Sequence, residues 1–177
     1  VICTDKTGTL TENKMGMTKI YSDQKEIPLE QLKNNQILID IMNNSNSATL
    51  KEDGLYSGDA VDVAIKNYLK EKKLNAIPVK KITELPFDSD RKMMSAIYQK
   101  EKEVYLYTKG SLESLLKRSK FILKNGKVEK ISEEDQEKYK EEEAKMSEEA
   151  LKVLAFDYKK IDKEVKNEKD YFKEEKD

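Results

Sequence analysis

Residues 92–108 read KMMSAIYQKEKEVYLYT, and this stretch predicts the central element of the fold. Apolar and aromatic side chains dominate residues 92–99 and 103–108, while the polar triplet KEK separates the two runs. Two such runs joined by a short polar connection predict a hairpin of two antiparallel strands. We therefore expect an antiparallel sheet at the centre of the chain, and the surrounding segments decide what covers it.

Two amphipathic helices are predicted before this hairpin, over residues 28–45 and 58–73. A strand is predicted over residues 17–23, and the polar stretch 45–57, which contains turn residues, is predicted to be a loop. The apolar positions that define the helical spacing are Leu29, Leu32, Ile37 and Ile41 in the first helix and Val61, Ile65, Tyr68 and Leu69 in the second.

Four further segments are predicted after the hairpin. Ser111 is a plausible N-cap for a helix carrying Leu112, Leu115 and Leu116, and Asn125-Gly126 favours a tight turn between two strands. Ser132, with Asp135 three residues on, caps a solvated helix over residues 132–151. A strand follows over residues 151–159, and the charged tail is expected to lie at an edge.

Composition limits the classes of function. The 177 residues contain 34 basic and 35 acidic side chains, and this balance argues against a nucleic-acid-binding protein. The length suits one domain with a fragment of a second. Cys3, the one cysteine, cannot form an internal disulfide, and the apolar run 37–42 is too short to span a membrane. The absence of an initial Met indicates a piece of something larger.

The first fifteen residues, VICTDKTGTLTENKM, place Asp5 after an apolar pair and before a glycine-containing loop. A carboxylate is a competent nucleophile towards a phosphoryl group, and Lys6 with the backbone amides around Gly8 could neutralise phosphate charge. From composition alone, a side-chain-stabilised turn at the end of a strand is the simpler interpretation of Asp5.

The stretch DKTGTLT, followed by ENKM, resembles the phosphorylation signature of P-type ATPases. The resemblance implies that Asp5 accepts the γ-phosphate of ATP and that Lys6 assists it. Thr7 helps to place Mg²⁺ through its main-chain carbonyl, so Asp5 and Thr7 are the expected metal residues of the complete pump. Related phosphatases have a second Asp as general acid/base where this chain has Thr7, and its absence favours a longer-lived phosphoenzyme.

Two further stretches are similar to the family's nucleotide pocket. SGDAVDVAI, residues 57–65, maps Asp62 onto the usual Glu near the adenine amino group. LPFDSDRKMMS, residues 85–95, implies that Phe87 stacks on adenine and that Lys92 faces the triphosphate, while Ser89 replaces an Arg. Without the family, Asp62 is a first-turn acid favoured by the helix dipole and Phe87 a core residue.

The pocket resemblance continues in YTKGSLESLL, residues 107–116, which contains the family's Lys-Gly element as Lys109 and Gly110. An exposed lysine among many is the alternative interpretation of Lys109. ALKVLAFDYK, residues 150–159, is similar to a family strand in which Lys152 replaces Arg. A lysine keeps the charge but loses the bidentate fork, so phosphate contact there should be weaker.

The resemblance implies an α/β protein of the α+β type, with a twisted, mainly antiparallel sheet flanked by helices. Residues 1–15 would begin the phosphorylation domain, and residues 16–177 would form the nucleotide-binding domain of a type II cation pump. Among type II pumps, the resemblance favours the calcium-transporting ones. The expected ligands are ATP and, in the complete enzyme, Mg²⁺. The parent would be a cation-translocating ATPase with this domain on the cytoplasmic face of a membrane.

The expected partners are the rest of the phosphorylation domain, the actuator domain and the transmembrane domain of the parent. No nucleic-acid partner is expected. By itself the chain is expected to bind ATP without hydrolysing it. Two alternatives stay open. One is a phosphatase of the haloacid-dehalogenase group, and the other is a non-catalytic interaction domain that docks a partner through the helix at residues 132–151.

Overall fold

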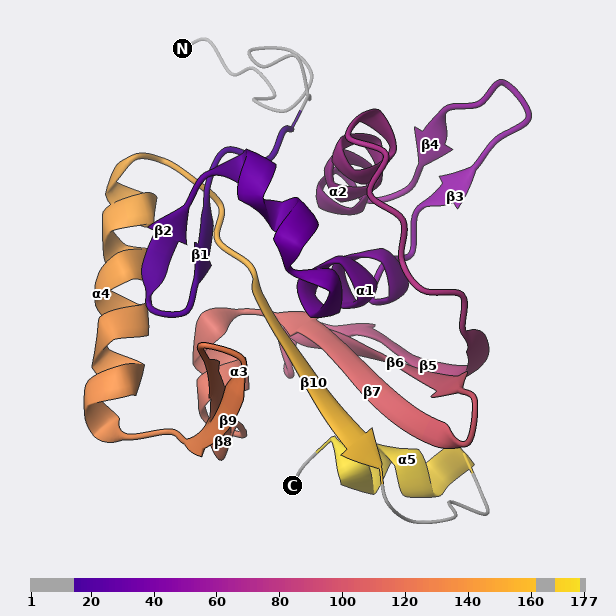
Figure 1. Cartoon of the computed structure of the whole chain (residues 1–177). Helices are drawn as coiled ribbons and strands as arrows, with labels where there is room; N and C mark the ends of the chain where they lie inside the picture. Colours follow the sequence, from indigo (N-terminus) through magenta and orange to yellow (C-terminus); the bar gives the residue numbers. More distant parts are fainter. Residues whose placement is uncertain (1–14, 162–167, 176–177) are drawn as a thin grey trace, which may run out of the picture.

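A four-stranded antiparallel sheet with the order β10–β7–β6–β5 forms the centre of the protein (Figure 1). The computed structural model describes residues 15–161 and 168–175. The strands are β5 (Lys80–Asp88), β6 (Met93–Lys100), β7 (Glu103–Gly110) and β10 (Ala155–Ile161). The predicted central hairpin is confirmed as β6 and β7, paired from Met93 with Gly110 to Lys100 with Glu103.

Strand β5 was not predicted, because Pro86 interrupts its apolar pattern. A proline lacks the backbone N–H that a central strand needs, so it normally argues against strand structure. Here β5 lies at the edge of the sheet, where the missing donor costs little.

Helices α1 (Gln36–Asn44) and α2 (Ala60–Glu71) cover one face of the sheet (Figure 1). The prediction of one helix over residues 28–45 is wrong at Asn35, which has φ −118° and ψ 76° and separates the 3₁₀ helix η1 (Leu29–Asn34) from α1. The Asn35 side chain accepts a 3.1 Å hydrogen bond from the backbone N–H of Leu38 and so caps α1. These helices, η1 and the residue Ile20 of the first hairpin form one buried core, which consists of Ile20, Leu32, Ile39, Met42, Ile65 and Leu69.

Two short hairpins that precede β5 in the chain lie outside the central sheet. The first pairs β1 (Ile20–Ser22) with β2 (Lys25–Ile27), so the predicted strand over residues 17–23 is shorter than expected. The second pairs β3 (Thr49–Leu50) with β4 (Tyr56–Ser57) inside a stretch predicted to be a loop.

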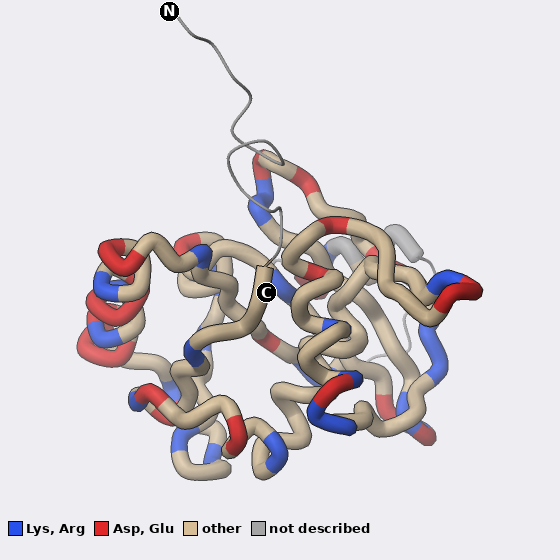
Figure 2. The backbone as a smooth tube through the Cα atoms, turned by 90° about the horizontal axis from the view of Figure 1, so that it is seen from above, with Lys and Arg blue, Asp and Glu red and all other residues tan. Residues whose placement is uncertain are grey.

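The segments after β7 confirm three local predictions. Helix α3 (Leu112–Leu116) is capped by Ser111, and α4 (Glu133–Glu148) begins with a capping box of Ser132 and Asp135. Asn125 and Gly126 have φ of 49° and 75° in the turn between β8 (Phe121–Lys124) and β9 (Lys127–Lys130). Charged side chains, mostly acidic, dominate α4, as expected for a helix exposed to solvent (Figure 2).

The opposite face of the sheet is covered by α5 (Glu168–Glu174) (Figure 1). Tyr171 of this helix is buried against Ile97, Leu106 and Ile161. The expectation that the charged tail lies at an edge is therefore wrong, because one aromatic side chain packs it onto the sheet. With helices on both faces, the predicted α+β fold and its mainly antiparallel sheet are confirmed. No helix among the described residues is both long and apolar enough to cross a bilayer.

Candidate functional site

Most of the predicted nucleotide residues meet at one end of the central sheet. The register pairs Met93 with Gly110 and Met94 with Lys109, so the turn over residues 88–92 lies beside the end of β7. This turn carries Ser89 and Lys92, and Phe87 directly precedes it. The fold thus brings together two stretches that are about twenty residues apart in the sequence.

The turn between β5 and β6 is held by its own hydrogen bonds. Asp88 Oδ1 accepts from the backbone N–H groups of Asp90 and Arg91 at 3.0 and 2.9 Å, and the Lys92 N–H donates to the Asp88 carbonyl at 2.7 Å. Phe87 is 66% exposed, and the Lys92 side chain is 60% exposed. An aromatic ring and a cation therefore project from a closed turn into solvent.

Asp62 and Lys109 form a buried ion pair on the face of the sheet covered by α1 and α2. Their side chains are 5% and 10% exposed, and the Lys109 ammonium donates to Asp62 Oδ1. The second oxygen, Asp62 Oδ2, accepts from the backbone N–H of Ser47 at 2.9 Å. The pair exists because Asp62 lies in the first turn of α2 and Lys109 points to the same side of β7.

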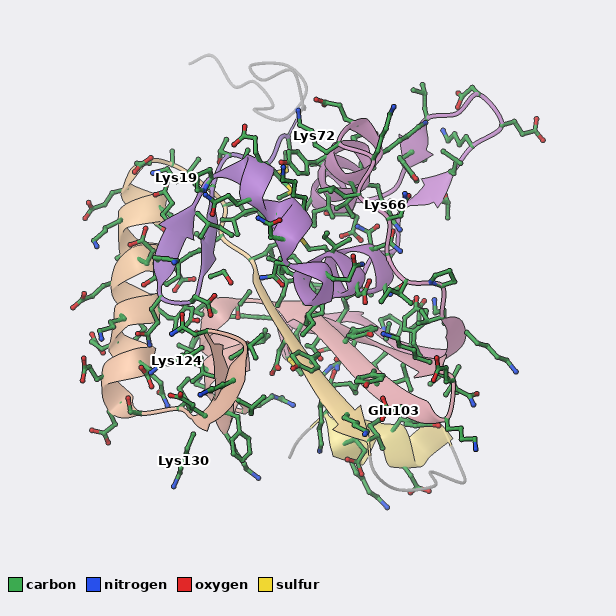
Figure 3. All side chains as sticks on the ribbon, viewed as in Figure 1. Lys19, Lys66, Lys72, Glu103, Lys124 and Lys130 are labelled. Carbon is green, nitrogen blue, oxygen red and sulfur yellow. The ribbon has the colours of Figure 1, made fainter. Side chains whose placement is uncertain are left out.

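Lys66 lies one helical turn after Asp62 and adds a second ammonium group to this region (Figure 3). Its Nζ donates to the backbone carbonyl and to Oδ1 of Asn43 at 2.9 and 2.7 Å. Burial lowers the pKa of Lys66; the negative charge of Asp62 opposes this shift, and the positive charge of Lys109 adds to it. We name Asp62, Lys66 and Lys109 the upper cluster; it holds two ammonium groups and one carboxylate.

Gly110 permits a close approach between the end of β7 and the β5–β6 turn. A Cβ at this position would lie 2.4 Å from Met93 Cβ and 2.7 Å from the Lys92 carbonyl oxygen. The same carbonyl accepts a 2.9 Å hydrogen bond from the Ser111 N–H. Lys152 is exposed and lies three residues before Ala155, the cross-strand partner of Gly110, which places it at the same end of the sheet.

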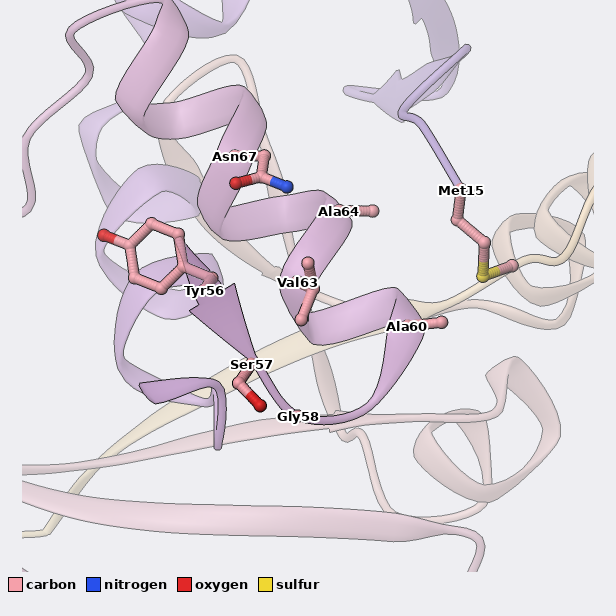
Figure 4. A pocket seen from close by; sticks show the side chains of 8 residues that line it. All are labelled: Met15, Tyr56, Ser57, Gly58, Ala60, Val63, Ala64 and Asn67. Atoms are coloured by element: carbon pink, nitrogen blue, oxygen red, sulfur yellow. The ribbon is translucent and has the colours of Figure 1, made fainter. Parts of the chain in front are cut away.

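Two surface hollows lie near α2, and Lys66 of the upper cluster lines the second. One of about 380 Å³ lies beside α2, as Figure 4 shows, and is lined by Met15, Tyr56, Ser57, Gly58, Ala60, Val63, Ala64 and Asn67. A second of about 470 Å³ is lined by Asn43, Tyr56, Lys66, Leu69, Lys70, Lys73, Leu74, Asn75 and Ala76. Phe87, Lys92 and Lys109 line neither hollow. The first also has no charged side chain that could neutralise a phosphate.

The predicted phosphorylation residues Asp5, Lys6 and Thr7 lie outside the described residues, and so does the expected Mg²⁺ site. Within residues 15–161 and 168–175, no group of three or more His, Cys, Asp or Glu side chains could hold a metal ion. The proposed division of the chain after residue 15 therefore stays a prediction.

Sequence reasoning missed two contributors to this end of the sheet. Lys66 was recognisable in principle, because it lies four residues after Asp62 on a predicted helix. Ser47 was not, because its contribution is a backbone N–H in a stretch predicted to be a loop.

The described residues define an α+β domain with cationic side chains gathered at one end of an antiparallel sheet. Comparison with known families gives the class directly: residues 17–177 match the family described as P-type ATPase, cytoplasmic domain N. The chain belongs to this family.

Individual relatives agree with this assignment. The chain is 40% identical over 173 residues to calcium-transporting ATPase 1 of Bacillus cereus, covering 90% of this chain and 19% of the relative. It is 33% identical over 174 residues to calcium-transporting ATPase 1 of Lactococcus lactis, and 34% identical over 171 residues to a calcium-transporting ATPase of Listeria monocytogenes. In both cases the match covers 91% of this chain and 19% of the relative. The chain thus spans about a fifth of the length of these relatives.

Proposed function

We propose that this chain is the ATP-binding domain of a cation-transporting P-type ATPase of the calcium-transporting kind. The observation that carries the proposal is the convergence of Phe87, Lys92 and Lys109 at one end of the sheet. An exposed ring offers a stacking surface for a base, and ammonium groups offer counter-charges for phosphates. The family match over residues 17–177 supports the same conclusion.

In the proposed complex, Phe87 stacks on adenine and Lys92 faces the triphosphate. A nucleotide that contacts both Asp62 and Lys109 must replace their mutual ion pair, so part of the gain in binding is lost. Ser89 and Lys152 each stand where a bidentate arginine would hold phosphate more firmly. We therefore expect a dissociation constant on the order of millimolar, or roughly −4 kcal/mol.

The chemical step belongs to Asp5 in this proposal. An Asp5 carboxylate oxygen attacks the γ-phosphorus, the bond from that phosphorus to the β–γ bridging oxygen breaks, and ADP leaves with its electron pair. Lys6 neutralises charge on the transferred group. Mg²⁺, placed with the help of Asp5 and Thr7, would supply further charge neutralisation when bound. Positioning and electrostatics then provide most of the catalysis.

Transport would require the parent's other parts. These are the rest of the phosphorylation domain, the actuator domain and the transmembrane domain, which would place this domain at the cytoplasmic face of a membrane. The transport activity named for the relatives is proposed here for the parent of this chain.

A nucleotide titration followed by amide chemical shifts tests the proposal. ATP and AMP should both shift the amides of Phe87, Lys92 and Lys109, because adenine supplies most of the contact. Phe87→Ala should weaken both ligands at least about fivefold, since stacking on an aromatic side chain is worth about 1–3 kcal/mol per base. Phe121→Ala is the matched control, because Phe121 is an exposed ring on β8, 61% accessible, outside the site.

ATP that leaves these three amides unmoved would overturn the proposal. Equal weakening by Phe87→Ala and Phe121→Ala would remove the assigned role of Phe87. Steady release of phosphate from small phosphoesters would instead favour the phosphatase alternative.

A further inference from the structure

A buried carboxylate lies on the other face of the sheet, beneath the candidate site. Glu175 directly follows α5, and its side chain is 4% exposed. Both of its carboxylate oxygens lie 2.5 Å from Arg91 Nη1, and Oε1 accepts a 2.6 Å hydrogen bond from Ser95 Oγ. Arg118 Nη1 lies 3.9 Å from Oε2 and donates to the Glu175 backbone carbonyl at 3.1 Å.

These partners come from segments far apart in the sequence. Arg91 belongs to the β5–β6 turn, Ser95 to β6, and Arg118 to the segment after α3. Ser95 Oγ also shares a 2.9 Å hydrogen bond with Thr108 Oγ1 of β7. We name Arg91, Ser95, Thr108, Arg118 and Glu175 the lower cluster.

The lower and upper clusters share strand β7, on which Thr108 and Lys109 are adjacent. Successive side chains of a strand point to opposite faces, so Met94 and Lys109 face α2 while Ser95 and Thr108 face α5. The candidate site and the Glu175 carboxylate are thus separated by the thickness of one sheet.

Arg91 connects the lower cluster to the aromatic residue of the site. Its Nη2 donates to the Pro86 carbonyl at 2.6 Å, and Pro86 immediately precedes Phe87. The guanidinium therefore lies between the Glu175 carboxylate and the backbone that carries the ring. A planar fork is suited to this task, because it donates to two acceptors in a fixed relative geometry.

We propose that Glu175 is a positioning residue for nucleotide recognition. Its carboxylate holds the Arg91 guanidinium against the Pro86 carbonyl and thereby fixes the backbone that presents Phe87 and Lys92. Charge-assisted hydrogen bonds to arginine are among the strongest in proteins, whereas a partly buried guanidinium without a carboxylate prefers to return to water. Loss of the carboxylate would release Pro86 and leave Phe87 more mobile. The effect on nucleotide affinity rests on the proposed function.

Glu175→Gln in the whole chain tests this inference, with Glu174→Gln as the matched control. Glu174 is the preceding residue, and it pairs with Lys159 of β10 at 2.9 Å instead of with the β5–β6 turn. Glu175→Gln should weaken ATP and AMP about three- to tenfold, which corresponds to roughly 0.7–1.4 kcal/mol. It should also lower the order of the Phe87 and Ser89 amides in ¹⁵N relaxation. Glu174→Gln should change neither property.

Arg91→Lys is a second variant that tests the same contact if Glu175→Gln does not fold. Lysine can still pair with Glu175 but lacks the fork that reaches Pro86, so it should reproduce the loss of order at Phe87. Loss of order at Phe87 with either variant, and not with Glu174→Gln, supports the inference.

If the unaltered chain binds nucleotide but Glu175→Gln and Glu174→Gln behave alike in affinity and in Phe87 order, the positioning role is wrong and the proposed function stands. If the unaltered chain binds no nucleotide, the proposed function fails. In that case the relaxation measurement still decides whether Glu175 fixes the turn.

Discussion

Replacing Asp62 by alanine removes the carboxylate that faces the buried ammonium group of Lys109 and the partly buried one of Lys66. Removing one partner of a buried ion pair costs about 3–5 kcal/mol, because the remaining charge is left uncompensated away from water. Solvent screens this ion pair little, since the Asp62 and Lys109 side chains are only 5% and 10% exposed. The Ser47 N–H also loses its acceptor. We therefore expect Asp62→Ala to lower the free energy of unfolding by at least about 3 kcal/mol.

The opposite deletion should cost less, and this asymmetry is the sharper part of the prediction. Lys109→Met leaves Asp62 with the Ser47 N–H and with the positive charge of Lys66 nearby. We expect it to cost about 1–3 kcal/mol, the range for one unsatisfied buried group. The double variant should be more stable than the sum of the single costs implies, with a coupling of about 2 kcal/mol.

Urea unfolding at neutral pH, followed by far-ultraviolet circular dichroism, measures these free energies. Glu137→Ala is the control: it breaks the exposed pair with Lys140 on α4 and should change stability by less than about 0.5 kcal/mol. The reasoning is refuted if Asp62→Ala costs less than about 1 kcal/mol, or if Lys109→Met costs more than Asp62→Ala.

Two further predictions concern the same sheet. Gly110→Ala should destabilise the protein by about 2 kcal/mol, because the new Cβ would overlap Met93 Cβ and the Lys92 carbonyl oxygen. Thermal melting measures the loss, with Gly16→Ala as the control, because a Cβ at Gly16 would meet no atom within 4 Å. Equal melting temperatures of the two variants would contradict the prediction. Burial raises the pKa of the Asp157 carboxyl in the folded protein above its usual value of 3.8. Above this raised pKa, ionisation of Asp157 lowers the free energy of unfolding. The loss disappears as the pH falls through the raised pKa towards 3.8. Asp157→Asn should therefore be more stable than the unaltered chain at pH 7, with a difference that shrinks on acidification, and a pH-independent difference in urea unfolding would show the explanation to be wrong.

The sequence predicted those elements whose signals are local. The hairpin formed by β6 and β7 follows from two apolar runs and the polar residues between them. The Asn125-Gly126 turn and the Ser132 cap depend on the conformation or the hydrogen bonding of a few adjacent residues. Each of these features was confirmed because neighbouring residues alone determine it.

The elements that were missed depend on where they lie in the fold. Strand β5 tolerates Pro86 because it is an edge strand, and a local pattern contains no information about edges. The helix predicted over residues 28–45 divides at Asn35. The backbone of Asn35 is not helical, and its side chain caps α1. Helix α5 is held by Tyr171, and the sheet surface that buries this ring comes from three other strand segments.

For the site, the motifs give the residue type at each position, and hence the family of the chain. Which of these residues come together depends on the fold. Asp62 and Lys109 are separated by 47 residues, and Arg91 and Glu175 by 84. The physical reason is that periodicity and capping act over a few residues, whereas the pairing of buried charges depends on strand register and on which face of a sheet a helix covers.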